Sequence, residues 1–79
     1  MKGWEKGAVR LGKRVRELRL ARGLSQERLG EACELHRTYV ADIERGHRNP
    51  SLWTLERLAA GLGCEVRDLF PQAAGASKR

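Results

Sequence analysis

The sequence predicts a helix from residue 37 to about residue 46. Four chemically different side chains share one face of this helix: Arg37, Thr38, Ala41 and Asp42. An arginine donates two parallel hydrogen bonds to guanine, and a threonine offers a hydroxyl to a base or a methyl group to thymine. An alanine leaves room for a thymine methyl group, and a carboxylate accepts from cytosine. This face is typical of one that reads bases in the major groove of double-stranded DNA. For Asp42 a structural or solvated role is the alternative, because phosphates would repel its charge.

A second group of residues could hold the DNA backbone beside that face. Gln26 begins the preceding predicted helix, where its amide and the unpaired N–H groups of the first turn can meet a phosphate. Arg45 and His47 lie at the other end of the reading helix and are candidates for additional phosphate contacts. Such contacts fix the register of a protein on DNA without reading its sequence.

These residues would be positioned by two short amphipathic helices joined by a tight turn, within residues 24–46. Ser25 can cap the first helix by accepting a backbone N–H bond, and His36 stands where the cap of the second helix belongs. Both helices carry apolar residues at helical spacing on their inward faces: Leu29, Ala32 and Cys33 in the first, Val40 and Ile43 in the second. The segment therefore predicts a helix-turn-helix.

Three further helices are predicted around this pair, so the expected fold class is all-α. The first spans about residues 8–22 and is followed by Gly23, a natural left-handed cap. A fourth helix lies between its cap Ser51 and Gly63, and a short fifth helix stops at Pro71. The apolar stripes of these three helices contain Leu11, Val15 and Leu18, then Leu52, Leu55, Leu58, Ala59 and Leu62, and finally Val66, Leu69 and Phe70.

The predicted helices divide the chain into three parts. Residues 8–70 form one DNA-binding and dimerisation domain. Residues 1–7 are expected to be a flexible basic N-terminus, and residues 71–79 a disordered tail.

Several short runs of this sequence carry a family resemblance: Leu24-Ser25-Gln26 followed by Leu29, Arg37-Thr38-Tyr39-Val40, Ile43-Glu44-Arg45-Gly46 and Asn49-Pro50-Ser51-Leu52. Together they resemble helix-turn-helix regulators of the Cro and phage-repressor (XRE) type, over about residues 9–70. The resemblance implies the compact five-helix domain of phage repressors, in which the first, fourth and fifth helices hold the helix-turn-helix pair. The run from His36 to Pro50 is most similar to the small controller proteins of restriction-modification systems.

The same resemblance implies roles for further residues. It gives Gln26 a phosphate contact and adds Tyr39, Arg48 and Asn49 as DNA-backbone contacts. For Tyr39 the alternative is a partly buried core ring. The family pattern also pairs the position of Glu44 with an arginine of the first helix, here Arg19, so we expect an ion pair that holds the reading helix in place.

One residue departs from the family pattern. Glu34 stands in the turn where these proteins usually have a glycine, at a position that tends to need a positive φ. A side chain there would strain the backbone by about 1 kcal/mol. We interpret Glu34 as a tolerated substitution within the motif.

Charge favours a polyanionic partner. The 79 residues include 16 Lys and Arg against 10 Asp and Glu, a net charge of +6. Residues 1–23 hold eight of those cations and two of the carboxylates, so the whole excess lies there. This segment could support the DNA backbone, and a solvated helix face is the alternative.

A domain this small is expected to bind DNA as a homodimer, because a two-fold dimer presents two reading helices to successive major grooves. The candidate interface is the predicted fifth helix with neighbouring apolar residues: Trp53, Leu62, Val66, Leu69 and Phe70. The alternative is that Val66, Leu69 and Phe70 close the core.

The remaining residues argue against other classes of protein. Cys33 and Cys64 lie without a Cys-x-x-Cys pattern and are expected to be free buried thiols, and with His36 and His47 they have the wrong spacing for a zinc site. No nucleophile with a base, cofactor motif or small-molecule site is evident, so an enzyme is not expected. The sequence has no signal peptide or membrane-spanning run and predicts a cytoplasmic protein.

The sequence therefore predicts a homodimeric, sequence-specific transcription regulator that binds a two-fold symmetric operator without a cofactor. It would act by occupying a promoter or by contacting RNA polymerase. A restriction-modification controller is the first specific interpretation. A phage-type repressor and an antitoxin, or another helix-turn-helix module that docks a protein, are the alternatives.

Overall fold

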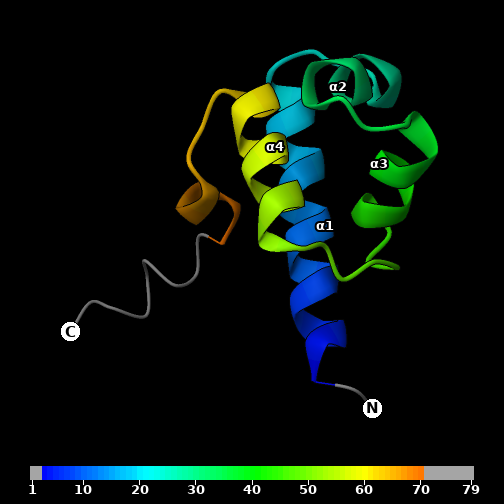
Figure 1. Ribbon diagram of the computed structural model, residues 1–79, viewed down its shortest axis with the longest axis vertical. Coiled ribbons are helices and arrows are strands. Elements are labelled where there is room, and N and C mark those ends of the chain that lie inside the picture. The colour runs from blue at the N-terminus through cyan, green and yellow to red at the C-terminus, as the bar shows by residue number, and fades with distance from the viewer. Residues whose placement is uncertain (1–2, 71–79) are drawn as a thin grey trace.

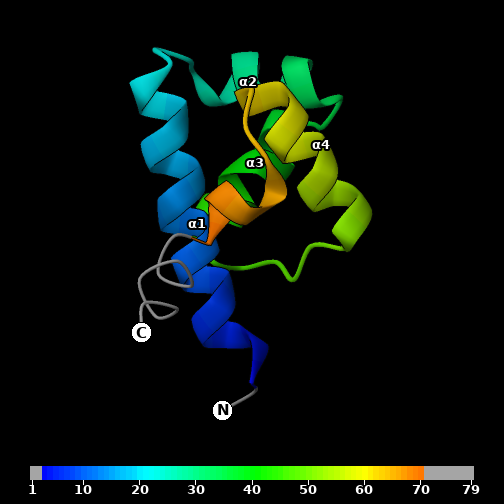
Figure 2. The ribbon, with the colours of Figure 1, turned by 90° about the vertical axis from the view of Figure 1, so that its left-hand side faces the viewer.

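The computed structural model describes residues 3–70, and in this range the fold is all-helical. Figure 1 shows α1 along the length of the molecule, with α2 across one end, α3 on one side, and α4 and η1 on the other. The view turned by 90° in Figure 2 places α1 at one edge and α4 at the other. None of the described helices is both long enough and apolar enough to cross a membrane. The elements are α1 (Trp4–Ala21), α2 (Gln26–Cys33), α3 (Arg37–Glu44), α4 (Leu52–Leu62) and the 3₁₀ helix η1 (Val66–Leu69).

The predicted caps begin and end these helices. The Ser25 hydroxyl accepts the Arg28 N–H at 3.0 Å, and His36 Nδ1 accepts the Thr38 N–H at 3.0 Å. Gly23 follows the end of α1 and Gly63 follows the end of α4. Their φ angles are +69° and +72°, the left-handed conformation expected of a glycine after a helix. The caps at Ser25 and His36 thus fix where α2 and α3 start.

The first helix begins earlier than the sequence predicted. α1 starts at Trp4, so residues 4–7, which were expected to be part of a flexible N-terminus, are helical. Gly7 is the only weak helix former there, and its cost of about 1 kcal/mol does not stop a helix whose next residue, Ala8, is buried. Met1 and Lys2, like the predicted disordered tail 71–79, lie outside the described residues.

The predicted fifth helix is a single 3₁₀ turn, so the domain has four α-helices and η1 in place of five helices. A capping box joins Glu65 and Asp68, and the Glu65 N–H donates to Asp68 Oδ2 at 2.9 Å. Phe70 has φ −133° and ψ 65°, outside the helical region, because it precedes Pro71. Only four residues are left between these limits, which is typical of a 3₁₀ helix.

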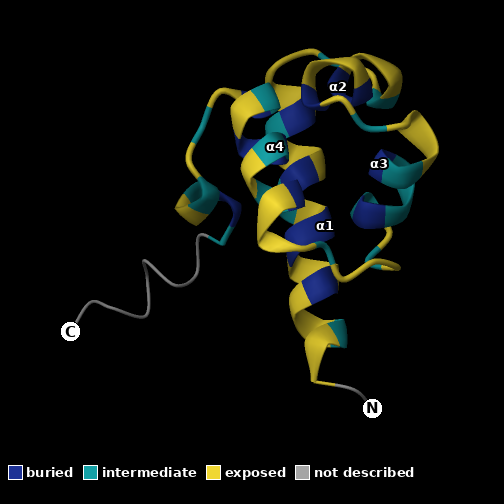
Figure 3. Ribbon diagram, viewed as in Figure 1, coloured by how far each residue is buried: buried dark blue, intermediate teal, exposed yellow. Residues whose placement is uncertain are grey.

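The core lies where α1 meets the other elements, and Figure 3 shows buried segments on the inward sides of all four α-helices. Two residues proposed for the dimer interface belong to this core, because Leu62 and Leu69 are only 2% and 1% exposed. They close the core of the single chain and have no surface to offer a partner, which corrects their assignment. The core residues are Leu11, Val15, Leu29, Cys33, Val40, Ile43, Leu58, Leu62 and Leu69.

Candidate DNA-binding interface

The turn between α2 and α3 contains the strained residue expected there. Glu34 is the only described non-glycine residue with a positive φ, at φ 59° and ψ 41°. Arg57 of α4 supports this turn, because its Nη1 donates to the Cys33 carbonyl at 3.1 Å and the Glu34 carbonyl at 3.3 Å. The same nitrogen lies 2.9 Å from the Glu34 carboxylate. A residue of a distant helix thus holds the turn of the helix-turn-helix.

Arg57 is a positioning residue that the sequence patterns did not reveal. Its guanidinium also stacks 4.1 Å from the ring centroid of Trp53, one helical turn earlier on α4. An aromatic residue and an arginine at i and i+4 are the sequence signal for such a stack. The contact with the Glu34 turn could not be predicted from the sequence, because it depends on how α4 packs against α2.

A buried ion pair ties α3 to α1. Arg19 Nε donates to Glu44 Oε2 at 2.6 Å and Arg19 Nη2 to Glu44 Oε1 at 3.1 Å, with side chains only 10% and 4% exposed. The third nitrogen of the same guanidinium, Arg19 Nη1, donates to the Leu24 carbonyl at 2.8 Å. Gln26 Nε2 donates to Glu44 Oε1 at 3.0 Å. This is the pair that the family pattern implied, and it joins α1, α3 and the first residue of α2.

The proposed reading residues stand at the exposed beginning of α3. Arg37 and Thr38 are exposed, whereas Ala41, one turn later, is half-buried. Val40 and Ile43 of the same helix are buried in the core. A hollow between α2 and α3 gathers residues predicted for both base and backbone contacts, and it is lined by Ser25, Gln26, Glu27, Arg37, Thr38, Ala41 and Arg45.

Asp42 is engaged within the protein. Its two carboxylate oxygens pair with Arg45, one turn later on the chain, and with Arg48 Nη2 at 3.4 Å. These contacts favour the structural alternative for Asp42 over hydrogen bonding to cytosine. They also hold two of the proposed phosphate contacts, Arg45 and Arg48, side by side at the end of α3.

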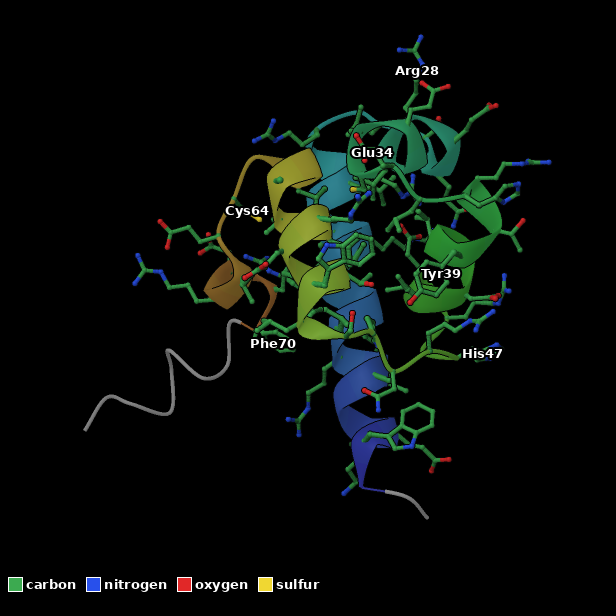
Figure 4. The ribbon with its side chains drawn as sticks, in the orientation of Figure 1. Arg28, Glu34, Tyr39, His47, Cys64 and Phe70 are labelled. Atoms are coloured by element: carbon green, nitrogen blue, oxygen red, sulfur yellow. The ribbon has the colours of Figure 1, made fainter. Side chains whose placement is uncertain are left out.

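The loop after α3 exposes the other proposed backbone contacts. His47, Arg48 and Asn49 are all exposed, and Arg48 lies 5.2 Å from the centroid of the Tyr39 ring. Tyr39 is half-buried and packs against the core, as the core-ring alternative expects, and its contact with the DNA backbone stays a prediction. Figure 4 shows Tyr39 and His47 on the α3 side of the molecule, away from Cys64 and Phe70. Gln26, at the other end of the surface, keeps one amide N–H in its bond to Glu44.

The two cysteines are free thiols. Cys33 is buried and Cys64 is half-buried. Burial raises the pKa of the Cys33 thiol from 9.0 to about 11, because the interior disfavours a thiolate. Burial is also the main cause that raises the pKa of Cys64. Both thiols are therefore protonated at neutral pH, where neither is an activated nucleophile.

Comparison with known proteins identifies relatives with this architecture. The family model HTH_3, helix-turn-helix, matches residues 15–69. Control protein C.BamHI of Bacillus amyloliquefaciens is 49% identical over 60 residues, which are 75% of this chain and 74% of that protein. The immunity repressor of Bacillus phage phi105 is 48% identical over 56 residues, which are 71% of this chain and 39% of the repressor.

A solved structure shows the same arrangement of helices. The crystal structure of the restriction-modification controller protein C.AhdI from Aeromonas hydrophila superposes with a TM-score of 0.80 and 49% sequence identity. The match covers 82% of this chain and 98% of that one. The chain thus belongs to the XRE-type helix-turn-helix family of transcription regulators, and restriction-modification controller proteins are among its relatives.

Proposed function

We propose that this protein is a homodimeric regulator that binds a two-fold symmetric DNA operator and reads it with Arg37 and Thr38. The observation that carries this proposal is the exposure of both side chains at the start of α3, a helix that a buried ion pair fixes to α1. A helix that is held in place and exposes Arg and Thr in its first turn suits base recognition, because the first turn of a recognition helix approaches the bases most closely. Ala41 would sit over a thymine methyl group.

The backbone contacts are proposed on both sides of the reading residues. Gln26 and the start of α2 would hold one phosphate, and Arg45, His47, Arg48 and Asn49 would hold the phosphates at the other end of α3. The exposure of these loop residues supports this role. Asp42 would keep Arg45 and Arg48 in position and would not contact a base, as its ion pairs indicate.

Dimerisation is proposed through the surface of α4 and η1. With Leu62 and Leu69 assigned to the core, Trp53, Val66 and Phe70 remain as candidates, and Trp53 is 61% exposed. The neighbouring Leu52 is 63% exposed and extends the apolar surface. Sedimentation at micromolar concentration tests this proposal. A strict monomer would contradict the dimer, and a dimer that Trp53→Ala abolishes would support an interface on α4 and η1.

The regulated system is proposed from the relatives. C.BamHI and C.AhdI are control proteins of similar sequence, so a restriction-modification controller is our first assignment. A phage-type repressor is the second, since the phi105 immunity repressor is 48% identical over the shared region. In vitro transcription from the operator-containing promoter separates activation through RNA polymerase, which would raise the yield of transcript, from simple repression, which would lower it.

Selection of binding sites from a random duplex pool at about 150 mM salt tests the proposed function, because backbone binding alone is weak at that salt concentration. We expect a two-fold symmetric motif with half-sites about one helical turn apart. Arg37→Ala should lose the preference at one base pair in each half-site and keep the rest. Absence of enrichment with the unaltered protein would contradict the proposal and favour a protein-docking role.

A further inference from the structure

A hollow with several cationic side chains lies beside the proposed DNA-binding surface, between the first turns of α1 and the end of α3. Lys6 and Arg10 of α1 line it together with Arg45 and His47, and Glu5 is its one carboxylate. Trp4, Val9 and Gly46 complete the lining. The hollow therefore joins two of the proposed phosphate contacts to two cations of the basic segment for which no individual contact had been named.

We propose that this hollow binds the DNA phosphates that flank each half-site, with Lys6 and Arg10 as additional backbone contacts. The inference rests on the proposed function, since it extends the same surface along the DNA. In Figures 1 and 2, α1 continues past the loop that follows α3, so its first turns stand beyond the end of the recognition helix. A cluster of cations in a hollow concentrates positive potential, which attracts a polyanion.

Three other arginines of the basic segment, residues 1–23, bind parts of the protein itself. Arg14 Nε donates to the Asp68 carbonyl at 2.8 Å, and Arg19 is engaged by the Glu44 pair. Arg22, at the far end of α1, lies 3.4 Å from the Gly63 carbonyl. Lys6 and Arg10 share their hollow with Arg45 and His47, which are proposed to contact DNA.

Close packing fixes the hollow in shape. Gly46 has φ +78°, and a Cβ built there would lie 3.0 Å from the Val9 side chain and 3.1 Å from its Cα. The loop after α3 therefore rests directly on α1 at Val9. Because the two walls are in contact, the backbone positions of Lys6 and Arg10 are set relative to those of Arg45 and His47, as a phosphate site that acts in register with α3 requires.

The salt dependence of DNA binding tests the inference with the variant Lys6→Gln/Arg10→Gln. Removing one phosphate contact makes the slope of log K against log salt shallower by about 0.9. The variant removes two contacts from each protomer and four from the dimer, so the slope should change by about 3.6. Arg22→Gln is the matched control, because it removes a cation from the opposite end of the same helix and should leave the slope unchanged. Circular dichroism and thermal melting should show both variants folded, since neither replaces a core residue.

Ethylation interference then locates the contacts, and a non-specific duplex separates the two proposals. In the unaltered protein, ethylation of flanking phosphates should weaken binding, and in the double variant that interference should disappear while the half-site pattern remains. The inference would be overturned if the unaltered protein and the double variant had equal salt slopes on both the operator and a non-specific duplex. It would also be overturned if Arg22→Gln changed the salt slope as much as the double variant does. Absence of operator preference in the unaltered protein would instead overturn the proposed function.

Discussion

Glu34 shows how a single residue can depart from its family and be accommodated. A side chain in the left-handed region costs about 1 kcal/mol, which a glycine would avoid. Arg57 offsets part of this cost by binding the Cys33 and Glu34 carbonyls, which the turn leaves without helical partners. The contact between Arg57 and the Glu34 carboxylate is largely solvent-exposed and contributes under about 1 kcal/mol.

Glu34→Gly is therefore expected to stabilise the domain, by up to about 1 kcal/mol, because the relief of backbone strain exceeds the loss of an exposed ion pair. Arg57→Ala should destabilise it by about 1 to 3 kcal/mol, since it removes the donors to the turn. Urea unfolding monitored by circular dichroism measures both. A neutral Arg57→Ala would show that the turn holds its shape without α4.

The Arg19–Glu44 pair is expected to be a large single contribution to stability. Removing one partner of a buried pair leaves an uncompensated charge, so Arg19→Ala should cost about 3 to 5 kcal/mol. The exposed pair Arg67–Glu65 is the matched control, and Arg67→Ala should cost under about 1 kcal/mol. A loss in Arg19→Ala as small as in Arg67→Ala, measured by urea unfolding, would contradict a structural role for the pair.

Cys33 predicts a loss of stability in alkaline solution. In the unfolded chain the thiol ionises with a pKa around 9.0, whereas the folded protein keeps it protonated up to about 11. The unfolded state thus releases a proton that the folded state retains, and stability falls as the pH rises from about 9 to about 11. The free energy of unfolding of Cys33→Ala, which has no thiol to titrate there, should fall less over this range. Parallel curves for the two proteins would contradict the prediction.

At the scale of the elements, the position of α3 depends on how closely it approaches α1. A Cβ at Gly12 would lie 2.5 Å from the Glu44 carbonyl oxygen and would also meet the Ile43 carbonyl oxygen. These are backbone atoms, which cannot turn aside as a flexible side chain does. Gly12 is therefore a point at which the backbones of α1 and α3 touch, at Glu44, whose side chain pairs with Arg19.

Gly12→Ala should push α3 away from α1 and cost about 1 to 3 kcal/mol, with weaker DNA binding. Gly7→Ala on the same helix is the matched control, because nothing lies within 4 Å of its Cβ. It should stabilise the domain by about 0.5 to 1 kcal/mol through better helix propensity. Thermal melting distinguishes them, and a shift of the same sign in both variants would contradict the close approach.

The sequence predicted the elements best where local chemistry determines them. Ser25, His36 and Ser51 cap their helices in the structure as expected, because a cap needs only a side chain and the N–H groups of the next turn. The start of α1 was not predicted, since it depends on the burial of Ala8 against the rest of the domain. The 3₁₀ form of η1 was not predicted either, although its limits, the capping box and Pro71, are local. The close approach at Gly12 has no local signal.

At the scale of the whole molecule, charge alone did not separate the roles of the cations. The sequence placed the entire excess of +6 in residues 1–23, but Arg14, Arg19 and Arg22 of that segment bind other parts of the protein. The fold thus uses three arginines of this basic segment within the protein and places Lys6 and Arg10 beside the proposed DNA surface. This separation of roles requires knowing which helices face α1, and a helical pattern does not contain this information.

The positions of some residues in the candidate site follow from the sequence, and those of others depend on the fold. Arg37 and Thr38 emerge exposed at the start of α3 because their position follows from the cap at His36. Leu62 and Leu69 were assigned to an interface but are core, because apolar spacing does not say whether a helix face meets its own chain or a partner. The ion pairs of Asp42 depend on the loop after α3, which brings Arg48 back to that helix.

A double-mutant cycle asks directly whether Arg37 reads a base within a two-fold operator. Affinities would be measured for the unaltered protein and Arg37→Ala, each with the selected operator and with one changed at the base pair whose preference Arg37→Ala loses. If Arg37 bonds to that base, we expect a coupling of about 1 to 3 kcal/mol per contact, so that Arg37→Ala no longer distinguishes the two duplexes. Independent, additive losses would contradict base reading and show that Arg37 contacts only the backbone.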